Sequence, residues 1–302
     1  MDSPSSDLLK EIIREKRTDR RWKNFRFIVW VALILFGAWI IFGESAQSSL
    51  NGSHYVALLR LNGMIDPEGH FSGAEVVPLL NDMFKDTDAK GIVLDINSGG
   101  GTPVQASIIH DAIIQLKKKY HKKVIVVGED MLTSGAYYVA VAGDKIYVNP
   151  NTITGSIGVI MKGFGFSDLI KKVGIERRVY VSGSDKDRLD PFLPQSPADV
   201  AKIKQVIDEV HNNFDQVVLE GRKGKLHADP KVLFTGDFWS GQTAVRLGLA
   251  DDLGNLTDVI EKEFKTSHYH EYNSSPGLLK LLSSGLNSSF NAVLESLSTK
   301  LQ

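Results

Sequence analysis

The sequence contains no cysteine, and its 36 acidic and 35 basic residues leave a formal net charge of only -1. The lack of cysteine excludes a disulfide, a thiolate nucleophile and a cysteine-ligated metal site. The near-zero charge argues against a nucleic-acid-binding protein, whose contact surface is usually strongly basic. The sequence also shows no pattern typical of a metal cluster, so neither a metal nor another cofactor is predicted.

Histidine, the usual catalytic base of serine enzymes, is absent from a long central stretch of the sequence. The eight histidines leave a gap between His121 and His211. His110 falls within a predicted helix and faces away from the nearest turn by position, and His121 ends that helix. A Ser-His-Asp triad therefore has no well-placed histidine, although it stays possible.

Long apolar stretches are represented by residues 27–42, which are all apolar apart from Gly37. With Gly43 and the stems of flanking basic residues, this length just spans a bilayer core of roughly 30 Å. Up to Arg26 there are 8 Lys or Arg against 5 Asp or Glu, so the positive-inside rule places the amino terminus in the cytoplasm. We expect an uncleaved single-pass anchor in the cell membrane, with a cleaved signal peptide or a buried core helix as alternatives.

The rest of the chain divides by composition. We predict a basic cytoplasmic segment at 1–26, the anchor at 27–43, a polar linker at 44–53, a globular domain at 54–265 and an amphipathic tail at 266–302. The tail could pack on the domain, pair with another subunit or rest on the membrane surface.

Two strand-turn-helix units organise the globular domain. The β-branched run at 122–128 leads to Ser134 and Gly135, where a helix begins, and the strand at 91–96 leads through Gly99, Gly100 and Gly101 to a helix at 103–120. Strands and helices alternate from residue 55 onward, which predicts an α/β fold with a mainly parallel sheet. In such a sheet both turns fall at the carboxyl ends of strands and can converge. Ser134 is then a candidate nucleophile and the turn amides candidate oxyanion donors, although close packing explains each turn alone.

Several further elements are expected downstream. The pattern predicts strands at 145–148 and 177–181, a helix at 166–173, and a long helix that starts at the capping sequence 196–199 and runs to about residue 220. The apolar stripe of this long helix is interpreted as core; it comprises Val200, Ile203, Ile207, Val210, Phe214 and Val217.

Lys186 is the alternative base for Ser134. It lies in a turn-forming loop after the predicted strand at 177–181, between Asp185 and Asp187. To accept a proton near neutral pH, its pKa must fall several units from about 10.4, which requires burial away from acids. From the loop alone, a solvated surface lysine is the simpler interpretation.

Residues from about 55 to 264 resemble the signal peptide peptidase A family of membrane-bound serine peptidases, short form, with the SohB-type relatives as a similar alternative. The resemblance rests on ordered motifs: Asn97-Ser98 with the following glycines, Thr133 to Tyr138, Ala142 to Ile146, Thr154 to Ile160, Ser182-Gly183 with Lys186-Asp187, and Gly248 to Asp251 with Gly254. One departure is Gly99, which stands where the family usually has proline.

The resemblance implies a Clp/crotonase-like fold of stacked βαβ units and a serine-lysine dyad. Ser134 would be the nucleophile, Lys186 the general base and Ser156 a residue that orients the lysine, with Gly100 and Gly135 at the oxyanion hole. The family forms rings in which neighbouring subunits share each site, and it degrades remnant signal peptides or other short hydrophobic segments at the membrane. An acyl-CoA enzyme of related fold and an inactive scaffold for membrane-protein quality control are the rival hypotheses.

Overall fold

The computed structural model describes Trp22, residues 24–33 and residues 54–273, in two units that divide between Ser53 and His54. In the first unit, the described residues form a helix with exposed side chains. No helix within these described ranges has both the length and the apolar character needed to cross a membrane. Most of the predicted anchor and all of the linker fall at 34–53, outside the described residues, as does the predicted tail from 274 onward.

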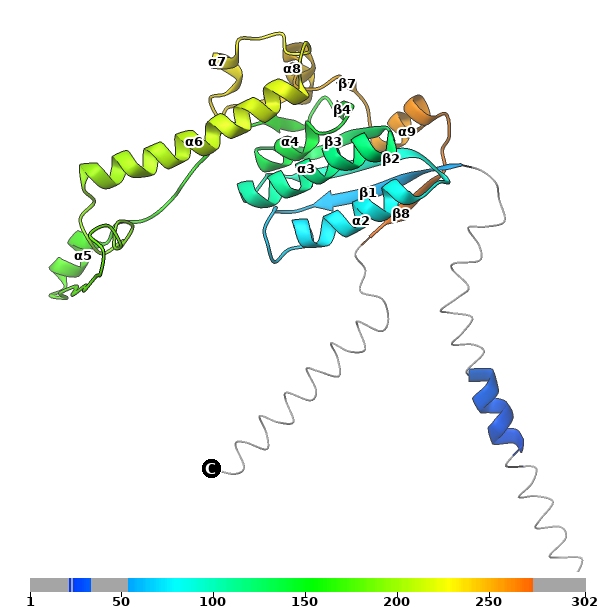
Figure 1. Ribbon diagram of the computed structural model, residues 1–302, viewed down its shortest axis with the longest axis horizontal. Coiled ribbons are helices and arrows are strands. Elements are labelled where there is room, and N and C mark those ends of the chain that lie inside the picture. The colour runs from blue at the N-terminus through cyan, green and yellow to red at the C-terminus, as the bar shows by residue number, and fades with distance from the viewer. Residues whose placement is uncertain (1–21, 23, 34–53, 274–302) are drawn as a thin grey trace, which may run out of the picture. The chain divides into compact units, whose positions relative to one another are not determined.

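The second unit is built on an eight-stranded sheet with the order β6-β5-β3-β2-β1-β8, in which β4 also pairs with β3 and β7 (Figure 1). Its strand pairs are parallel except β5 with β6, so the predicted mainly parallel α/β fold is confirmed. The strands are β1 (Tyr55–Asn62), β2 (Ala89–Ser98), β3 (Val124–Thr133), β4 (Lys145–Val148), β5 (Ile153–Gly155), β6 (Phe238–Ser240), β7 (Asp252–Leu253) and β8 (Tyr269–Tyr272).

Helices cover both faces of the sheet, because the central strands are apolar on both sides. One face packs against α2 (Gly73–Lys85), α3 (Pro103–Tyr120) and α4 (Gly135–Ala140), and the other packs against α9 (Leu256–Phe264). The remaining helices are α5 (Ser167–Lys172), α6 (Pro197–Gly221), α7 (Pro230–Leu233) and α8 (Gly241–Leu247).

The predicted boundaries hold where local signals are strong. Helix α3 occupies the predicted 103–120, with Pro103 in its first turn and His121 in the left-handed region at its end. Strand β4 likewise occupies the predicted 145–148. Strand β8 differs from its prediction: it lies in the stretch assigned to an amphipathic tail, but it pairs with β1 at the edge of the sheet.

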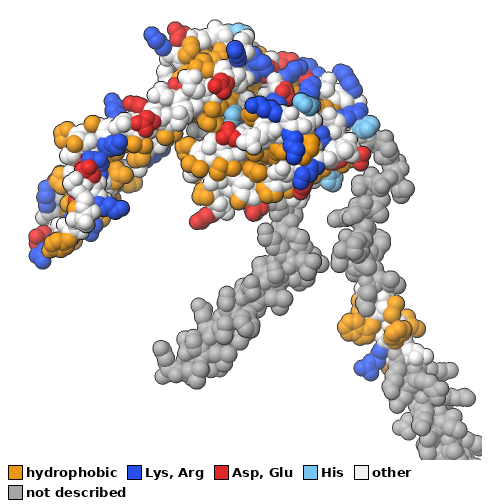
Figure 2. Space-filling model, in the orientation of Figure 1, with side chains coloured by type: hydrophobic (Ala, Val, Ile, Leu, Met, Phe, Trp, Pro, Cys, Tyr) orange, Lys and Arg blue, Asp and Glu red, His pale blue; other side chains and the backbone are white. Residues whose placement is uncertain are grey.

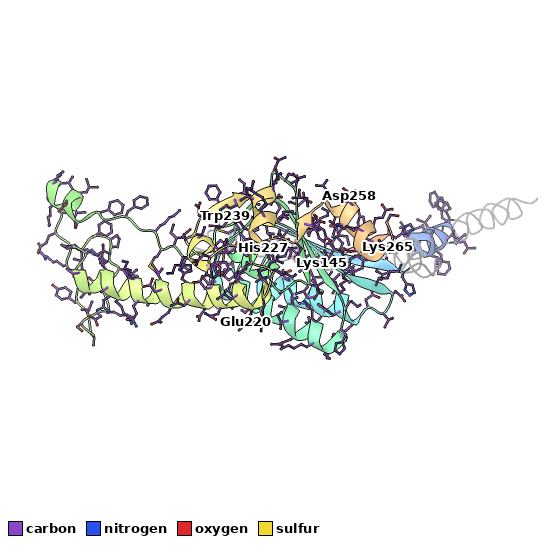
Figure 3. The ribbon with its side chains drawn as sticks, turned by 90° about the horizontal axis from the view of Figure 1, so that it is seen from above. Lys145, Glu220, His227, Trp239, Asp258 and Lys265 are labelled. Carbon is purple, nitrogen blue, oxygen red and sulfur yellow. The ribbon has the colours of Figure 1, made fainter. Side chains whose placement is uncertain are left out.

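Residues 158–213 form what we call the arm, a segment in which no residue is buried. Helix α6 carries the arm away from the sheet, and α5 lies near its far end in both ribbon views, while Glu220 marks the end of α6 on the sheet side (Figure 1 and Figure 3). Helix α6 begins with the predicted capping box, in which the Ser196 hydroxyl accepts from the Asp199 amide at 3.1 Å.

Two predictions about the arm need correction. The stripe on α6 is core only at its carboxyl end, where Phe214 is buried and Val217 packs against the core, because the stripe residues from Val200 to Val210 are not buried. Residues 177–181 do not form a strand, because no neighbouring strand among the described residues is present to complete the hydrogen bonds; Tyr180 there is 92% exposed. Alternation of apolar residues suggests a strand only where a sheet is available to receive it.

Candidate functional site

Ser134 occupies the sharp junction between β3 and α4. Its backbone has φ 53° and ψ -125°, outside the helical and extended regions, and its amide donates to the Gly155 carbonyl at 2.8 Å. A serine at positive φ carries a conformational cost, and such strained residues concentrate at functional sites. The prediction that Ser134 stands at a strand-to-helix turn is confirmed.

The glycine turn after β2 lies directly against this junction. Gly100 has φ +98°, and a Cβ placed on it would lie 2.7 Å from the Ser134 Cβ and 2.8 Å from the Gly135 nitrogen. Gly101 is equally constrained on its other side, where an added Cβ would meet the Ile65 carbonyl oxygen at 1.9 Å. The two predicted turns therefore converge, and glycine is required because the backbones approach too closely for any side chain.

Two backbone amides at this contact are available to an incoming group. The Gly135 amide is at the first position of α4 and has no partner within the helix. The Gly101 nitrogen lies 3.2 Å from where a Cβ on Gly135 would stand. Across residues 54–273, we find no acceptor bonded to either amide. Together they can receive a negatively charged oxygen beside Ser134.

The amide of Gly100 is already used, since it donates to the Ser98 hydroxyl at 3.1 Å. Gly100 therefore contributes close packing against Ser134, while Gly101 supplies the available donor. The sequence predicted the amides of this turn as donors and singled out Gly100, whereas the structure leaves the neighbouring Gly101 amide available.

A cavity of about 280 Å³ opens beside Ser134. Its wall is mainly apolar and combines α3, α4, the segment after β5 and the sheet-side end of α6. Sequence reasoning missed the α6 contribution, because the apolar stripe was interpreted as core. The lining residues are Gly101, Pro103, Val104, Ala106, Ser107, Ser134, Gly135, Tyr138, Gly158, Val159, Ile160, Val210, Asn213 and Phe214.

Ser156 directly follows β5, the strand that pairs with the end of β3 before Ser134. Strands β3 and β5 pair Thr133 with Gly155, so the two serines follow at adjacent positions. Ser156 also has a positive φ, 51°, and its amide donates to the Asp237 carbonyl at 2.7 Å. Within the described part of the chain, neither serine hydroxyl has a hydrogen-bond partner.

Lys186 lies elsewhere, on the arm. It is exposed, and its amide donates to the Gly183 carbonyl at 3.2 Å. Nearby, the Arg188 guanidinium donates to the Asp199 carboxylate at 2.7 Å and ties this loop to the first turn of α6. Asp199 and the cavity residue Phe214 are fifteen positions apart on that helix, which is about 22 Å. Within one chain, Lys186 does not reach Ser134.

No described histidine takes the place of Lys186 as a base beside Ser134. Nδ1 of His110 lies 2.9 Å from the Asp111 carboxylate, and its ring packs edge-on against Tyr138 with centroids 5.3 Å apart. On its other side Tyr138 packs against the cavity residue Phe214, with ring centroids 5.2 Å apart. None of the described histidines forms a hydrogen bond with Ser134.

Parallel strands that end in a strained serine and free amides define an α/β protein with its candidate site at the carboxyl edge of the sheet. The model of peptidase family S49 matches residues 116–268, about half of the sequence, and the chain belongs to this family.

Two relatives with similar sequences carry different names. A protein of Brucella melitensis biotype 1 that carries the name Na(+)/H(+) antiporter NhaA is 42% identical over 214 residues, which is 69% of this chain and 29% of that protein. A protein of Enterococcus faecium that bears the name of signal peptide peptidase SppA is 28% identical over 236 residues, 76% of this chain and 68% of that protein. The chain thus spans less than a third of the length of the Brucella relative. Among solved structures, a point mutant of ClpP1 from Listeria monocytogenes has a TM-score of 0.44 and 16% identity, over 67% of this chain and 94% of that one.

Proposed function

We propose that the protein is a membrane-anchored serine endopeptidase that uses Ser134 as nucleophile and Lys186 of a neighbouring copy as general base. The observation that carries the proposal is the unpartnered Ser134, held at positive φ between free amides and an apolar cavity. Family membership supports peptide-bond cleavage as the reaction.

In the proposed mechanism, neutral Lys186 takes the proton of the Ser134 hydroxyl while the Ser134 oxygen attacks the peptide carbonyl carbon. The amides of Gly101 and Gly135 stabilise the oxyanion of the tetrahedral intermediate. The protonated lysine then gives its proton to the leaving amine, and water hydrolyses the acyl-enzyme by the same route. Ser156 would hold the lysine beside Ser134, which suits its place directly after the adjacent strand.

The arm supports the assignment of Lys186 to a neighbouring copy. Its exposed apolar side chains are poor partners for water, and a second subunit would cover them. Figure 2 shows hydrophobic side chains along the arm, mixed with Lys and Arg. They include Ile160, Met161, Phe164, Leu169, Val173, Ile175, Tyr180, Val181, Leu189 and Val200. A ring of copies related to the Clp/crotonase assemblies is the arrangement that we propose.

The substrate class follows from the cavity. Its apolar wall suits a hydrophobic side chain of an extended peptide, so we propose short hydrophobic or unfolded segments, including remnant signal peptides, as substrates. With the anchor at 27–43, the peptidase domain would face the extracytoplasmic side of the cell membrane.

The test is hydrolysis of a signal-peptide-like peptide by the full chain in detergent, comparing the native protein with Ser134→Ala, Lys186→Ala and the two variants co-assembled. Each single variant should lose at least about a thousandfold in kcat. Random co-assembly should restore roughly a quarter of native activity, because one site in four then pairs an intact serine with an intact lysine.

Native-like cleavage by Lys186→Ala would contradict the lysine assignment and make His110 the next residue to test. Absence of cleavage in the native protein, with normal assembly, would instead support the inactive scaffold.

A further inference from the structure

Strand β3 contains a bulge immediately before the nucleophile. Strands β2 and β3 pair Ile96 with Gly128, but the next pair is Ser98 with Leu132. Two residues of β2 therefore oppose four of β3, and the extra length leaves residues 129–131 exposed. Bulges of this kind change the direction of a strand and re-aim the side chains that follow. Ser134 follows this bulge after Leu132 and Thr133.

Asn97 joins this bulge to the glycine turn. Its Nδ2 donates to the Asp130 carboxylate at 3.2 Å, and its Oδ1 accepts from the Met131 amide at 3.1 Å. Its backbone carbonyl accepts from the Gly63 amide at 3.0 Å, so one residue links the ends of three adjacent strands. We call these two side-chain bonds the Asn97 brace.

The glycine turn needs such a connection. Gly99, Gly100 and Gly101 have no side chains, and glycine has the most backbone freedom to lose on folding. Ile65 holds this turn from one side, since its amide donates to the Gly100 carbonyl at 2.9 Å, but that bond does not join the turn to β3. On the β3 side, Ser134 follows Met131 by three residues, so the Asn97 brace fixes both halves of the site relative to each other.

We infer that Asn97 is a positioning residue for the peptidase reaction: its two side-chain bonds set the distance between the Ser134 hydroxyl and the turn amides. This inference rests on the function proposed above. Because the cavity wall comes from α3, α4 and α6 and not from the bulge, loss of the brace should weaken stabilisation of the transition state while substrate binding is retained. A small displacement of reacting groups is enough to slow such a reaction strongly.

A reversal of the hydrogen bond tests this role in the full-length assembled protein. In Asn97→Asp, one oxygen still accepts from Met131, but the other faces the Asp130 carboxylate and is repelled. In the double variant Asn97→Asp with Asp130→Asn, the new amide donates to the new carboxylate, so the brace is restored in the opposite direction. Glu129→Gln is the matched control, since it makes the same acid-to-amide change on the same bulge without touching Asn97.

We expect Asn97→Asp to lower kcat for peptide hydrolysis by about 10- to 100-fold with KM within about twofold, and the double variant to recover to within about threefold of native. Glu129→Gln should have the native kcat and KM at pH 6. The inference is overturned if Asn97→Asp keeps its kcat, or if the double variant is no faster than Asn97→Asp although both unfold at the same temperature.

Failure of the proposed function gives a different result. In that case the native protein would be no faster than Ser134→Ala, whatever residue 97 is. If Asn97→Asp does not fold, Asp130→Ala removes one of the two side-chain bonds and should lower kcat by a smaller factor, again with KM unchanged. An unaltered kcat in Asp130→Ala would then overturn the inference.

Discussion

The sheet and the arm differ in where their apolar side chains find partners. On β1, β2 and β3 these side chains are buried within the chain, and the nucleophile, the free amides and the cavity lie at the carboxyl edge of those strands. In the arm, residues 158–213 include none that is buried, and Lys186 lies among them. The sheet thus supplies the nucleophile and the free amides, and the root of the arm adds Val159 and Val210 to the cavity wall, while the far part of the arm has no partner among the described residues to cover its apolar side chains.

The largest expected effect comes from filling the contact between the two turns. In Gly100→Ala, the new methyl group would overlap Ser134 and the Gly135 nitrogen at a φ that favours glycine. We expect kcat to fall by at least about a hundredfold, because the amides can no longer approach the nucleophile. Peptide hydrolysis measures the loss. As a control for stability, Gly163→Ala in the arm has open space around it and should leave the unfolding temperature unchanged.

Changing apolar residues in the two regions should separate assembly from stability. The double variant Phe164→Ser with Tyr180→Ser alters side chains that are 82% and 92% exposed. We expect a change in unfolding free energy below about 0.5 kcal/mol, but at least a tenfold loss of activity together with smaller assemblies in sedimentation. Leu94→Ala in the sheet should instead cost about 2–5 kcal/mol. Native-size assemblies from the arm variant would show that these side chains are not at the subunit contact.

The third prediction concerns the pH dependence of folding stability, through Asp95 on β2. Burial and the neighbouring Glu129 carboxyl raise the pKa of Asp95 to about 7, against the opposing effect of Arg60, whose guanidinium lies 2.6 Å away. The folded state therefore binds a proton more tightly than the unfolded state. The folding stability that comes from this tighter proton binding is fully present below about pH 4 and is lost as the pH rises through 7.

The unfolding free energy of the full chain, measured from pH 5 to 9, should fall for the native protein and stay flatter for Glu129→Gln. Glu263 does not complicate this range. Burial would raise its pKa, but Lys123, Lys145 and the Tyr147 hydroxyl outweigh that effect and lower it to about 2. Its contribution is lost only in acid, as the pH falls from about 4.5 through 2. A native profile as flat as that of the variant would rule out a raised pKa of Asp95 caused by Glu129.

The smallest effect is expected from Gly99→Pro. Gly99 has no positive φ, and a Cβ there would make ordinary contact with the Met131 side chain at 3.4 Å. The substitution should stabilise the protein by about 0.4–1 kcal/mol by restricting the unfolded chain. Chemical denaturation would measure the gain, and a clear loss of stability would show that the turn needs the freedom of glycine at this position.

Local sequence signals predicted the strand-turn-helix units well. Gly100 and Pro103 each fit a specific backbone geometry that the residue type itself favours, whereas the positive φ of Ser134 is imposed by the junction around it. The cavity was not predictable in this way, because Phe214 comes from a helix far along the chain from Ser134. An apolar stripe on α6 has the same pattern whether its partner is a core, a cavity or another subunit. The bulge at residues 129–131 was missed for a similar reason, since it is visible only as a change in pairing between strands.

The length of α6 has a consequence for regulation of dosage. If Lys186, in the loop tied to the first turn of α6, serves the Ser134 of another copy, a newly made chain is inactive until it assembles with other copies. Activity would then rise more steeply than the concentration of the protein. Below the concentration at which copies assemble, a twofold dilution would then remove more than half of the activity.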